Sequence, residues 1–293
     1  MFRHPRVQLA VLALAACVAL LAVPAASAIS SGTIVFRAHR GTASFIYTMN
    51  ADGGDLKQWG PGVQPTISRN GKTIVYAKAS EEGQLDLWAR NADGRDLRQL
   101  THDPSSTSPS LAPNGQKVVF IRARPDGDGA NIFTIDIDGT NERKVTQGAG
   151  NYYSPSFSAD GKRIVFLAQI DGKREIETMD SGGGDVVELA AASTGLREVE
   201  KPSYSPDGKQ ILFSASSGKA ARIFLCDAKD GGGRVSLTKP DEEGAEPAFS
   251  PPGTAIVFRR GANLFRMNTD GSAVRQLTDV GASSANADPS WGE

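Results

Sequence analysis

The residues with the best spacing for chemistry are two carboxylates, Glu246 and Asp288, each directly before a proline in a phrase that recurs along the chain. If the recurrence is structural, they fall on adjacent repeats and could share a cation with backbone carbonyl oxygens, because hard divalent cations prefer oxygen ligands. Lys201 holds the same position one repeat earlier, and its positive charge disfavours a metal there. We therefore expect neither a metal nor another cofactor.

Nucleophilic or zinc catalysis has little support in the sequence. Of the three histidines, only His39 and His102 lie beyond the N-terminal segment, and the chain has neither a G-x-S-x-G nor an H-E-x-x-H motif. Cys226 ends a strand-like run without a histidine in the same repeat, which favours a buried thiol over a nucleophile. We expect a protein that is not an enzyme. The alternative is a metal-assisted lyase or hydrolase with its site at a channel mouth.

Two kinds of aspartate string are similar to calcium loops. The D-x-D-G string at residues 136–139 recurs periodically and lacks a terminal glutamate, so it indicates a turn. Asp126 and Asp128 form a better candidate because they lie in a segment that differs between repeats. We nevertheless expect a solvated loop there.

The elements that position these residues follow from the recurring phrase. Residues 155–166, PSFSADGKRIVF, return in similar form at 65–76, 109–120, 202–213 and 247–258. A sixth copy is divided between residues 289–292 and 32–36. The phrase reads as a strand, an Asp-Gly or Asn-Gly turn and a β-branched strand, which is the pattern of a hairpin.

The spacing of the repeats sets the architecture. The six prolines are 42 to 47 residues apart, which accommodates four short strands and is typical of propeller blades. We predict an all-β, six-bladed β-propeller with four-stranded antiparallel blades, closed by pairing of the N- and C-terminal segments in one blade. Residues 29–293 would form this single domain. Extra glycines at 182–184 and 231–233 predict longer turns in the fourth and fifth periods.

The repeat resembles that of the TolB-like propeller family, also described as WD-type Pro-Asp repeats. Residues 202–213 and 155–166 are the closest copies, and the resemblance covers residues 32–291. It implies the propeller fold, and a periplasmic role in which the propeller binds a lipoprotein and other proteins. TolB carries an α/β domain before its propeller; we expect none here, so the role of that domain is not carried over.

The N-terminus has the pattern of a secretory signal peptide. Arg3 and Arg6 precede an apolar run that ends in the small residues 26–28. We predict cleavage near Ala28, an extracytoplasmic protein that is periplasmic or secreted, and no transmembrane segment in the mature form. Lipid attachment at Cys17 is the less favoured alternative, because the apolar run continues past this residue.

The charge composition limits the classes of partner that the chain can bind. Without residues 1–28 the chain has 30 basic and 33 acidic residues, a net charge of −3, which argues against nucleic-acid binding through bulk charge. We expect a monomer that binds an extracytoplasmic protein or a cell-envelope component. A glycan is the alternative ligand. Cys226 is the one cysteine of the mature chain, so no internal disulfide is predicted.

The binding surface is predicted from differences between repeats. The Asp-Gly turns should emerge on one face, here called the turn face, and the remaining loops on the other, here called the variable face. Loops that differ are free to specialise, and aromatic and arginine side chains carry interface energy. The predicted partner-binding residues are Tyr152, Tyr153, Arg122, Arg124, His102 and Asp103. The alternative for the tyrosine pair is that one of them packs between blades.

The residues before the six prolines should surround the mouth of the central channel. They are Gln64, Ser108, Ser154, Lys201, Glu246 and Asp288, and we call them the mouth ring.

Overall fold

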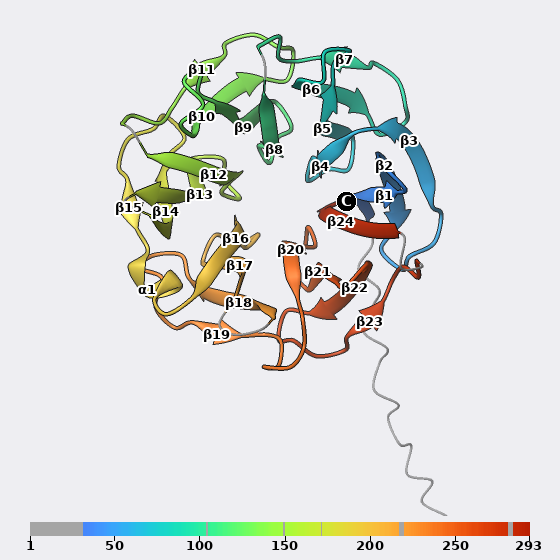
Figure 1. Cartoon of the computed structure of the whole chain (residues 1–293). Helices are drawn as coiled ribbons and strands as arrows, with labels where there is room; N and C mark the ends of the chain where they lie inside the picture. The colour runs from blue at the N-terminus through green and yellow to red at the C-terminus, as the bar shows by residue number, and fades with distance from the viewer. Residues whose placement is uncertain (1–31, 104, 149, 171, 217–219, 281–283) are drawn as a thin grey trace, which may run out of the picture.

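The computed structural model describes residues 32–293 except 104, 149, 171, 217–219 and 281–283. Within these residues, six four-stranded antiparallel sheets are arranged as blades around a central axis (Figure 1). The predicted all-β, six-bladed propeller is therefore confirmed. The predicted signal peptide, Ala28 and Cys17 lie outside the described residues. None of the helices in the described part is both long and apolar enough to span a membrane.

Each blade contributes its innermost strand to the wall of the channel. In order from blade 1 to blade 6, these strands are β24 (Ser284–Gly292), β4 (Val63–Ile67), β8 (Ser106–Leu111), β12 (Asn151–Phe157), β16 (Arg197–Tyr204) and β20 (Ala245–Phe249). The second strands are β1 (Thr33–Arg40), β5 (Thr73–Ala79), β9 (Lys117–Ala123), β13 (Arg163–Ile170), β17 (Gln210–Ser216) and β21 (Ala255–Arg260).

The third and outer strands complete the blades. The third strands are β2 (Ala43–Asn50), β6 (Leu85–Asn91), β10 (Ala130–Asp136), β14 (Lys173–Asp180), β18 (Ala221–Asp227) and β22 (Asn263–Asn268). The outer strands are β3 (Lys57–Pro61), β7 (Arg98–Gln99), β11 (Arg143–Lys144), β15 (Val187–Glu188), β19 (Val235–Ser236) and β23 (Arg275–Gln276). A short helix, α1 (Ala190–Ser193), lies between blades 4 and 5.

The Asp-Gly hairpins have the chemistry that the sequence predicts. Gly161 and Gly208 both have φ of 73°, a left-handed conformation that glycine adopts without steric cost. The preceding carboxylate closes each turn: Asp207 Oδ1 accepts hydrogen bonds from Ser205 Oγ at 2.6 Å and Lys209 N at 3.1 Å. The hydroxyl bond from Ser205 lowers the pKa of Asp207. These turns are therefore fixed locally by sequence.

The expectation of longer turns in two blades is half correct. In blade 4, Asp180 N donates to Gly184 O, which is the same turn length as in blades 1, 2, 3 and 6, so the prediction for this blade is wrong. The three glycines occupy ordinary turn positions there. In blade 5, Asp227 N donates to Gly232 O, so this turn is one residue longer and the prediction is confirmed.

The hydrophobic core lies between neighbouring blades. Phe166 from the second strand of blade 4 is 1% exposed and belongs to a cluster with Val119 and Ile132 of blade 3. Equivalent phenylalanines of four other blades are equally buried: Phe36, Phe120, Phe213 and Phe258. Because each apolar strand is covered on both faces, it can be continuously hydrophobic.

Ring closure occurs in blade 1. Strand β24 lies beside β1 (Figure 1). In this pair Thr33 is opposite Gly292 and Ile34 is opposite Trp291. Trp291 is 5% exposed and packs in the cluster that contains Phe36. The predicted pairing of the terminal segments is confirmed, and it removes a free sheet edge.

Candidate functional site: the channel and its charged mouth

The six residues of the mouth ring share an unusual backbone conformation. Their φ values lie between 46° and 52°, in the left-handed region that side chains other than glycine rarely adopt. At each of them the pairing of the innermost strand with the second strand shifts in register, which defines a β-bulge. The following proline disfavours right-handed helical backbone at this position. The repeat therefore builds one bulge per blade within each inner strand, directly before its proline.

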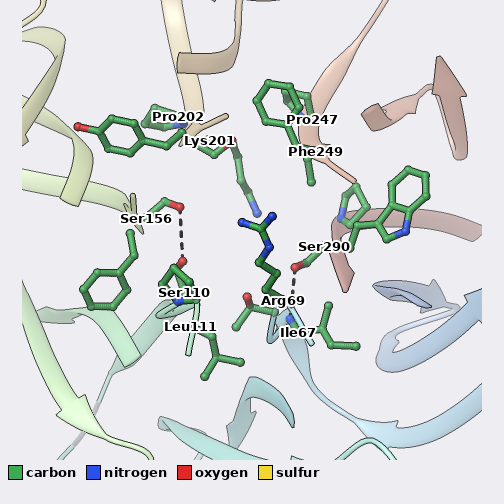
Figure 2. Close-up of a pocket in the computed structure, with 18 of the residues that line it drawn as sticks. Ile67, Arg69, Ser110, Leu111, Ser156, Lys201, Pro202, Pro247, Phe249 and Ser290 are labelled. Atoms are coloured by element: carbon green, nitrogen blue, oxygen red, sulfur yellow. Dashed lines mark hydrogen bonds between the residues drawn. The ribbon is translucent and has the colours of Figure 1, made fainter. Parts of the chain in front are cut away.

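The bulges surround a cavity of about 250 Å³ on the channel axis (Figure 2). Gln64, Ser108, Ser154 and Lys201 line it. Below them the wall carries the six prolines of the repeat, Pro65, Pro109, Pro155, Pro202, Pro247 and Pro289, and a layer of hydroxyls from Thr66, Ser110, Ser156, Ser203 and Ser290. The channel thus has a polar mouth, a rigid collar and hydroxyl groups inside.

Half of the mouth ring is charged and internally paired. Asp288 is 7% exposed. Its Oδ1 accepts a hydrogen bond from Lys201 Nζ at 2.5 Å, and its Oδ2 forms an ion pair with Arg37 Nε at 2.9 Å. Glu246 accepts Arg259 Nε at 3.2 Å on Oε1 and Asp288 N at 2.6 Å on Oε2. Lys201 belongs to blade 5 and Asp288 to blade 1, so the pair spans the position of blade 6.

The pKa values of this half follow from burial and opposite charge. Burial acts to raise the pKa of Asp288, but the charges of Lys201 and Arg37 outweigh it, and the pKa lies below the usual value. Burial acts to lower the pKa of Lys201, but Asp288 and Glu246 raise it above the usual value. Both groups are therefore held in their charged forms. Nearby Glu200 has a raised pKa, because burial and the charge of Glu246 disfavour its ionised form.

The other half of the mouth ring is neutral. It consists of Gln64, Ser108 and Ser154. Gln64 Oε1 accepts a hydrogen bond from Ser108 N at 2.9 Å. Glu246 Oε2 accepts the equivalent bond from Asp288 N, so the same link between neighbouring blades is made by an amide in one case and by a carboxylate in the other. The backbone scaffold is sixfold, whereas the charge distribution is not. The mouth consequently has a polar side and an ionic side.

The structure separates the two predicted tyrosines. Tyr152 is 6% exposed and packs edge-to-face on Phe166, with ring centroids 5.8 Å apart. Its hydroxyl donates to Gln147 O at 3.3 Å, and burial raises its pKa. The alternative in which one tyrosine packs between blades therefore describes Tyr152, and its ring is not offered on the surface as we had expected.

Tyr153 is only partly buried. The Arg174 guanidinium lies 4.6 Å from the centre of its ring, and the Tyr153 hydroxyl donates to Gln169 Oε1 at 3.1 Å. A residue that directly precedes the mouth ring thus presents an aromatic ring with a cation over its face. Sequence spacing gave no sign of Arg174, which is contributed by another strand of the blade.

The predicted arginines already have intramolecular partners. Arg122 binds both carboxylate oxygens of Glu142, at 2.6 and 2.7 Å, and its Nη1 lies 3.1 Å from Asp103 Oδ2. Arg124 Nη1 donates to Gly150 O at 2.8 Å. His102 and Asp103 are exposed. The arrangement brings Arg122 and Asp103 together but leaves Tyr152 in the core.

One residue of the channel was missed by sequence reasoning. Arg69 lines the cavity at its turn-face end, and its Nη2 donates to Pro251 O at 3.0 Å (Figure 2). The sequence did mark Arg69 as unusual, because three other blades have a proline at the equivalent position of the repeat: Pro113, Pro206 and Pro251.

Comparison with known proteins places this geometry in a family. Residues 123–293, more than half of the chain, match the model described as the TolB beta propeller domain. The chain belongs to the TolB beta propeller domain family. Among curated relatives it is similar to a TolB homolog of Chlorobium luteolum, 29% identical over 155 residues, which cover 52% of this chain and 35% of that protein.

A second curated relative is described as a peptidase. This uncharacterized peptidase of Bacillus subtilis, YuxL, is 27% identical over 206 residues, covering 68% of this chain and 29% of the relative. The chain therefore spans about a third of the length of these curated relatives. The crystal structure of TolB from Acinetobacter baumannii matches with a TM-score of 0.74 at 22% identity, covering 89% of this chain and 66% of that one, which supports the fold.

The structure also bears on metal ligation and on the single cysteine of this TolB-type propeller. Among the described residues, no group of three or more His, Cys, Asp or Glu side chains is arranged to hold a metal ion. Cys226 is 1% exposed and packs in the core between blades 4 and 5. Burial raises the pKa of its thiol to about 12, so the predicted buried thiol is confirmed.

Proposed function

We propose that this TolB-type propeller is a non-catalytic scaffold that binds a protein of the cell envelope on its variable face, around the mouth ring. The observation that carries the proposal is the asymmetry of this ring. Six equivalent bulges present Lys201, Glu246 and Asp288 on one side and neutral side chains on the other. A scaffold requires the equivalent backbone, but it does not require different charges on each blade.

Physical chemistry supports a protein partner at this mouth. Lys201 and Arg37 keep 36% and 31% of their side chains exposed while paired with Asp288. A partner can therefore contact charges that are already oriented, and such complementarity governs specificity and association rate. Tyr153 with Arg174 adds an aromatic and cationic contact next to the ring, and these residue types are enriched among interface hot spots.

The enzyme alternative remains a separate prediction. A metal-assisted lyase or hydrolase at the channel mouth requires free carboxylates, whereas Asp288 and Glu246 are neutralised by Lys201, Arg37 and Arg259. Metal analysis of the purified protein tests it directly. A tightly bound divalent ion in stoichiometric amount would favour the enzyme over the scaffold.

The scaffold proposal is tested by quantitative capture of envelope proteins on the immobilised propeller. Lys201→Gln removes a charge from the mouth ring, and Tyr153→Ala removes the adjacent ring. Each should weaken capture of the same partner by about tenfold or more, because a central interface residue contributes roughly 2 kcal/mol. The matched control is Lys162→Gln, an exposed lysine of the turn face.

The variants of the variable face and the control variant of the turn face should differ in capture of the partner. Lys162→Gln should capture the partner like the unmodified protein, and thermal melting should show that all three variants are folded. Loss of capture by Lys162→Gln, together with normal capture by both mouth variants, would place the binding surface on the turn face and reject the proposal. Recovery of the partner from an extracytoplasmic fraction would also support the proposed localisation.

A further inference from the structure

The turn face departs from its repeat at the channel, where Arg69 stands in blade 2. The equivalent position, four residues after the proline of the repeat, is Pro113 in blade 3, Ala159 in blade 4, Pro206 in blade 5, Pro251 in blade 6 and Glu293 in blade 1. In blades 3 to 6 these side chains are small or rigid, and in blade 1 the side chain is acidic. Blade 2 instead places a long cationic side chain at the turn-face end of the channel.

The side chain of Arg69 reaches across the opening. Its Nη2 donates to Pro251 O at 3.0 Å, and because Pro251 belongs to blade 6, the side chain passes the whole width of blade 1. Arg69 lines the cavity and remains exposed. Figure 2 shows its guanidinium pointing toward the channel axis. The hydrogen bond to Pro251 holds the cation in a defined position.

The positive charge of Arg69 is not neutralised within the described residues, where no carboxylate lies within ion-pair distance of it. The acidic residue next to it is Glu293 of blade 1, whose backbone N donates to Arg69 O at 2.8 Å, but neither carboxylate of Glu293 forms an ion pair with the Arg69 guanidinium. In the equivalent turns of blades 4 and 5, Asp160 accepts from Ser158 Oγ and Lys162 N, and Asp207 from Ser205 Oγ and Lys209 N. A guanidinium has five N–H donors in a planar fork that matches a carboxylate. The bond to Pro251 leaves donors for a ligand.

We propose that the turn-face end of the channel binds the carboxylate of a small ligand, with Arg69 forming the charge-assisted hydrogen bonds. The cavity of about 250 Å³ lies below the usual range for drug-sized ligands, roughly 300 to 1,000 Å³. It therefore fits one small organic acid or the carboxyl-terminal end of a peptide. The hydroxyls of Ser110, Ser156 and Ser290 lie deeper in the channel and can hydrogen-bond the body of the ligand.

Arg69 lies at the opposite end of the same cavity from the mouth ring and is not part of the proposed partner surface, so different variants test the two proposals. The probes for the Arg69 site are two carboxylates of different origin: D-glucuronate, a sugar acid, and N-acetyl-L-alanine, which represents a peptide carboxyl terminus. Their neutral counterparts are D-glucose and N-acetyl-L-alaninamide. Binding is measured by ligand-observed NMR and by calorimetry, since affinities in the millimolar range are expected for one charged contact.

The decisive variant is Arg69→Pro, which restores the residue of three other blades and is therefore compatible with the local backbone. We expect at least one acid to bind the unmodified protein and to bind Arg69→Pro about tenfold or more weakly. The neutral counterpart of that acid should bind neither of these two proteins. Which acid binds distinguishes a sugar acid from a peptide terminus. Arg143→Gln is the control, because Arg143 also donates to a neighbouring blade, but at the outer rim.

Two results would overturn the proposal. The first is that neither acid binds the unmodified protein at millimolar concentration. The second is that an acid binds Arg69→Pro as tightly as the unmodified protein, or loses affinity equally with Arg143→Gln. Arg69→Gln, which lacks the charge, provides an independent check that does not introduce a proline. It should weaken acid binding by a similar factor.

Discussion

Replacement of Asp288 by asparagine tests the electrostatics of the mouth ring. The substitution retains the size of the side chain and the tolerance of left-handed backbone that Asp and Asn share, but it removes the charge between Lys201 and Arg37. Breaking a fully buried ion pair costs about 3 to 5 kcal/mol. Because Lys201 and Arg37 are about one third exposed, water stabilises them after the change. We expect a loss of about 2 kcal/mol of unfolding free energy at pH 7.

The sign of the pH dependence follows from the direction of the pKa shift. The folded-state pKa of Asp288 is lowered, so its contribution to stability is present above the unfolded value of 3.8 and is lost as the pH falls through the folded value. Asparagine does not titrate. The difference in stability between the two proteins should therefore be largest near neutral pH and should shrink below about pH 3.8.

Urea unfolding at pH 7 and near pH 3 measures this difference. Asp241→Asn, which changes an exposed acid, is the control and should alter the unfolding free energy by less than about 0.5 kcal/mol. The reasoning would be refuted if Asp288→Asn were as stable as the unmodified protein at pH 7. It would also be refuted by a difference that stayed constant across the pH range.

Three further predictions concern the scaffold. Deleting residues 287–293 removes most of β24 (Ser284–Gly292) and should unfold or aggregate the protein; an unchanged melting temperature would contradict closure through this strand. Gly208→Val forces a β-branched residue to a φ of 73° where an added Cβ meets no atom within 4 Å, so urea unfolding should show a loss of about 1 to 3 kcal/mol from the backbone alone. The thiol of Cys226, with its pKa raised to about 12, should react with iodoacetamide at pH 8 only after denaturation; rapid labelling of the folded protein would contradict its burial.

The fold could be predicted because its signals are local and repeated. The side chains of the Asp-Gly turns stabilise the hairpins, as the hydrogen bonds of Asp207 show. The number of blades follows from the spacing of the prolines. Even the divided blade was visible, since residues 289–292 and 32–36 complete one phrase. Mutually consistent local preferences are what allow a sequence to specify one structure.

The site could be predicted only in part, because its contacts are made across the ring. Adjacent residues of a strand point to opposite sides, so the sequence implied that Tyr152 and Tyr153 differ, but not which of them faces the core. Lys201 and Asp288 are 87 residues apart, and their pairing depends on a side chain that reaches past a whole blade. Arg69 reaches past blade 1 in the same manner. Such contacts depend on the diameter of the channel, which the repeat does not encode directly.

The central claim, a protein-binding surface on the variable face, is tested most directly by site-specific photo-crosslinking in the native envelope fraction. His102 and Asp93 are both exposed residues of blade 2 or its connection to blade 3, and they lie on the variable face and the turn face respectively. A photoreactive residue at His102 should form a defined adduct with a partner protein, and the same residue at Asp93 should not. An adduct from Asp93 with none from His102 would contradict the claim.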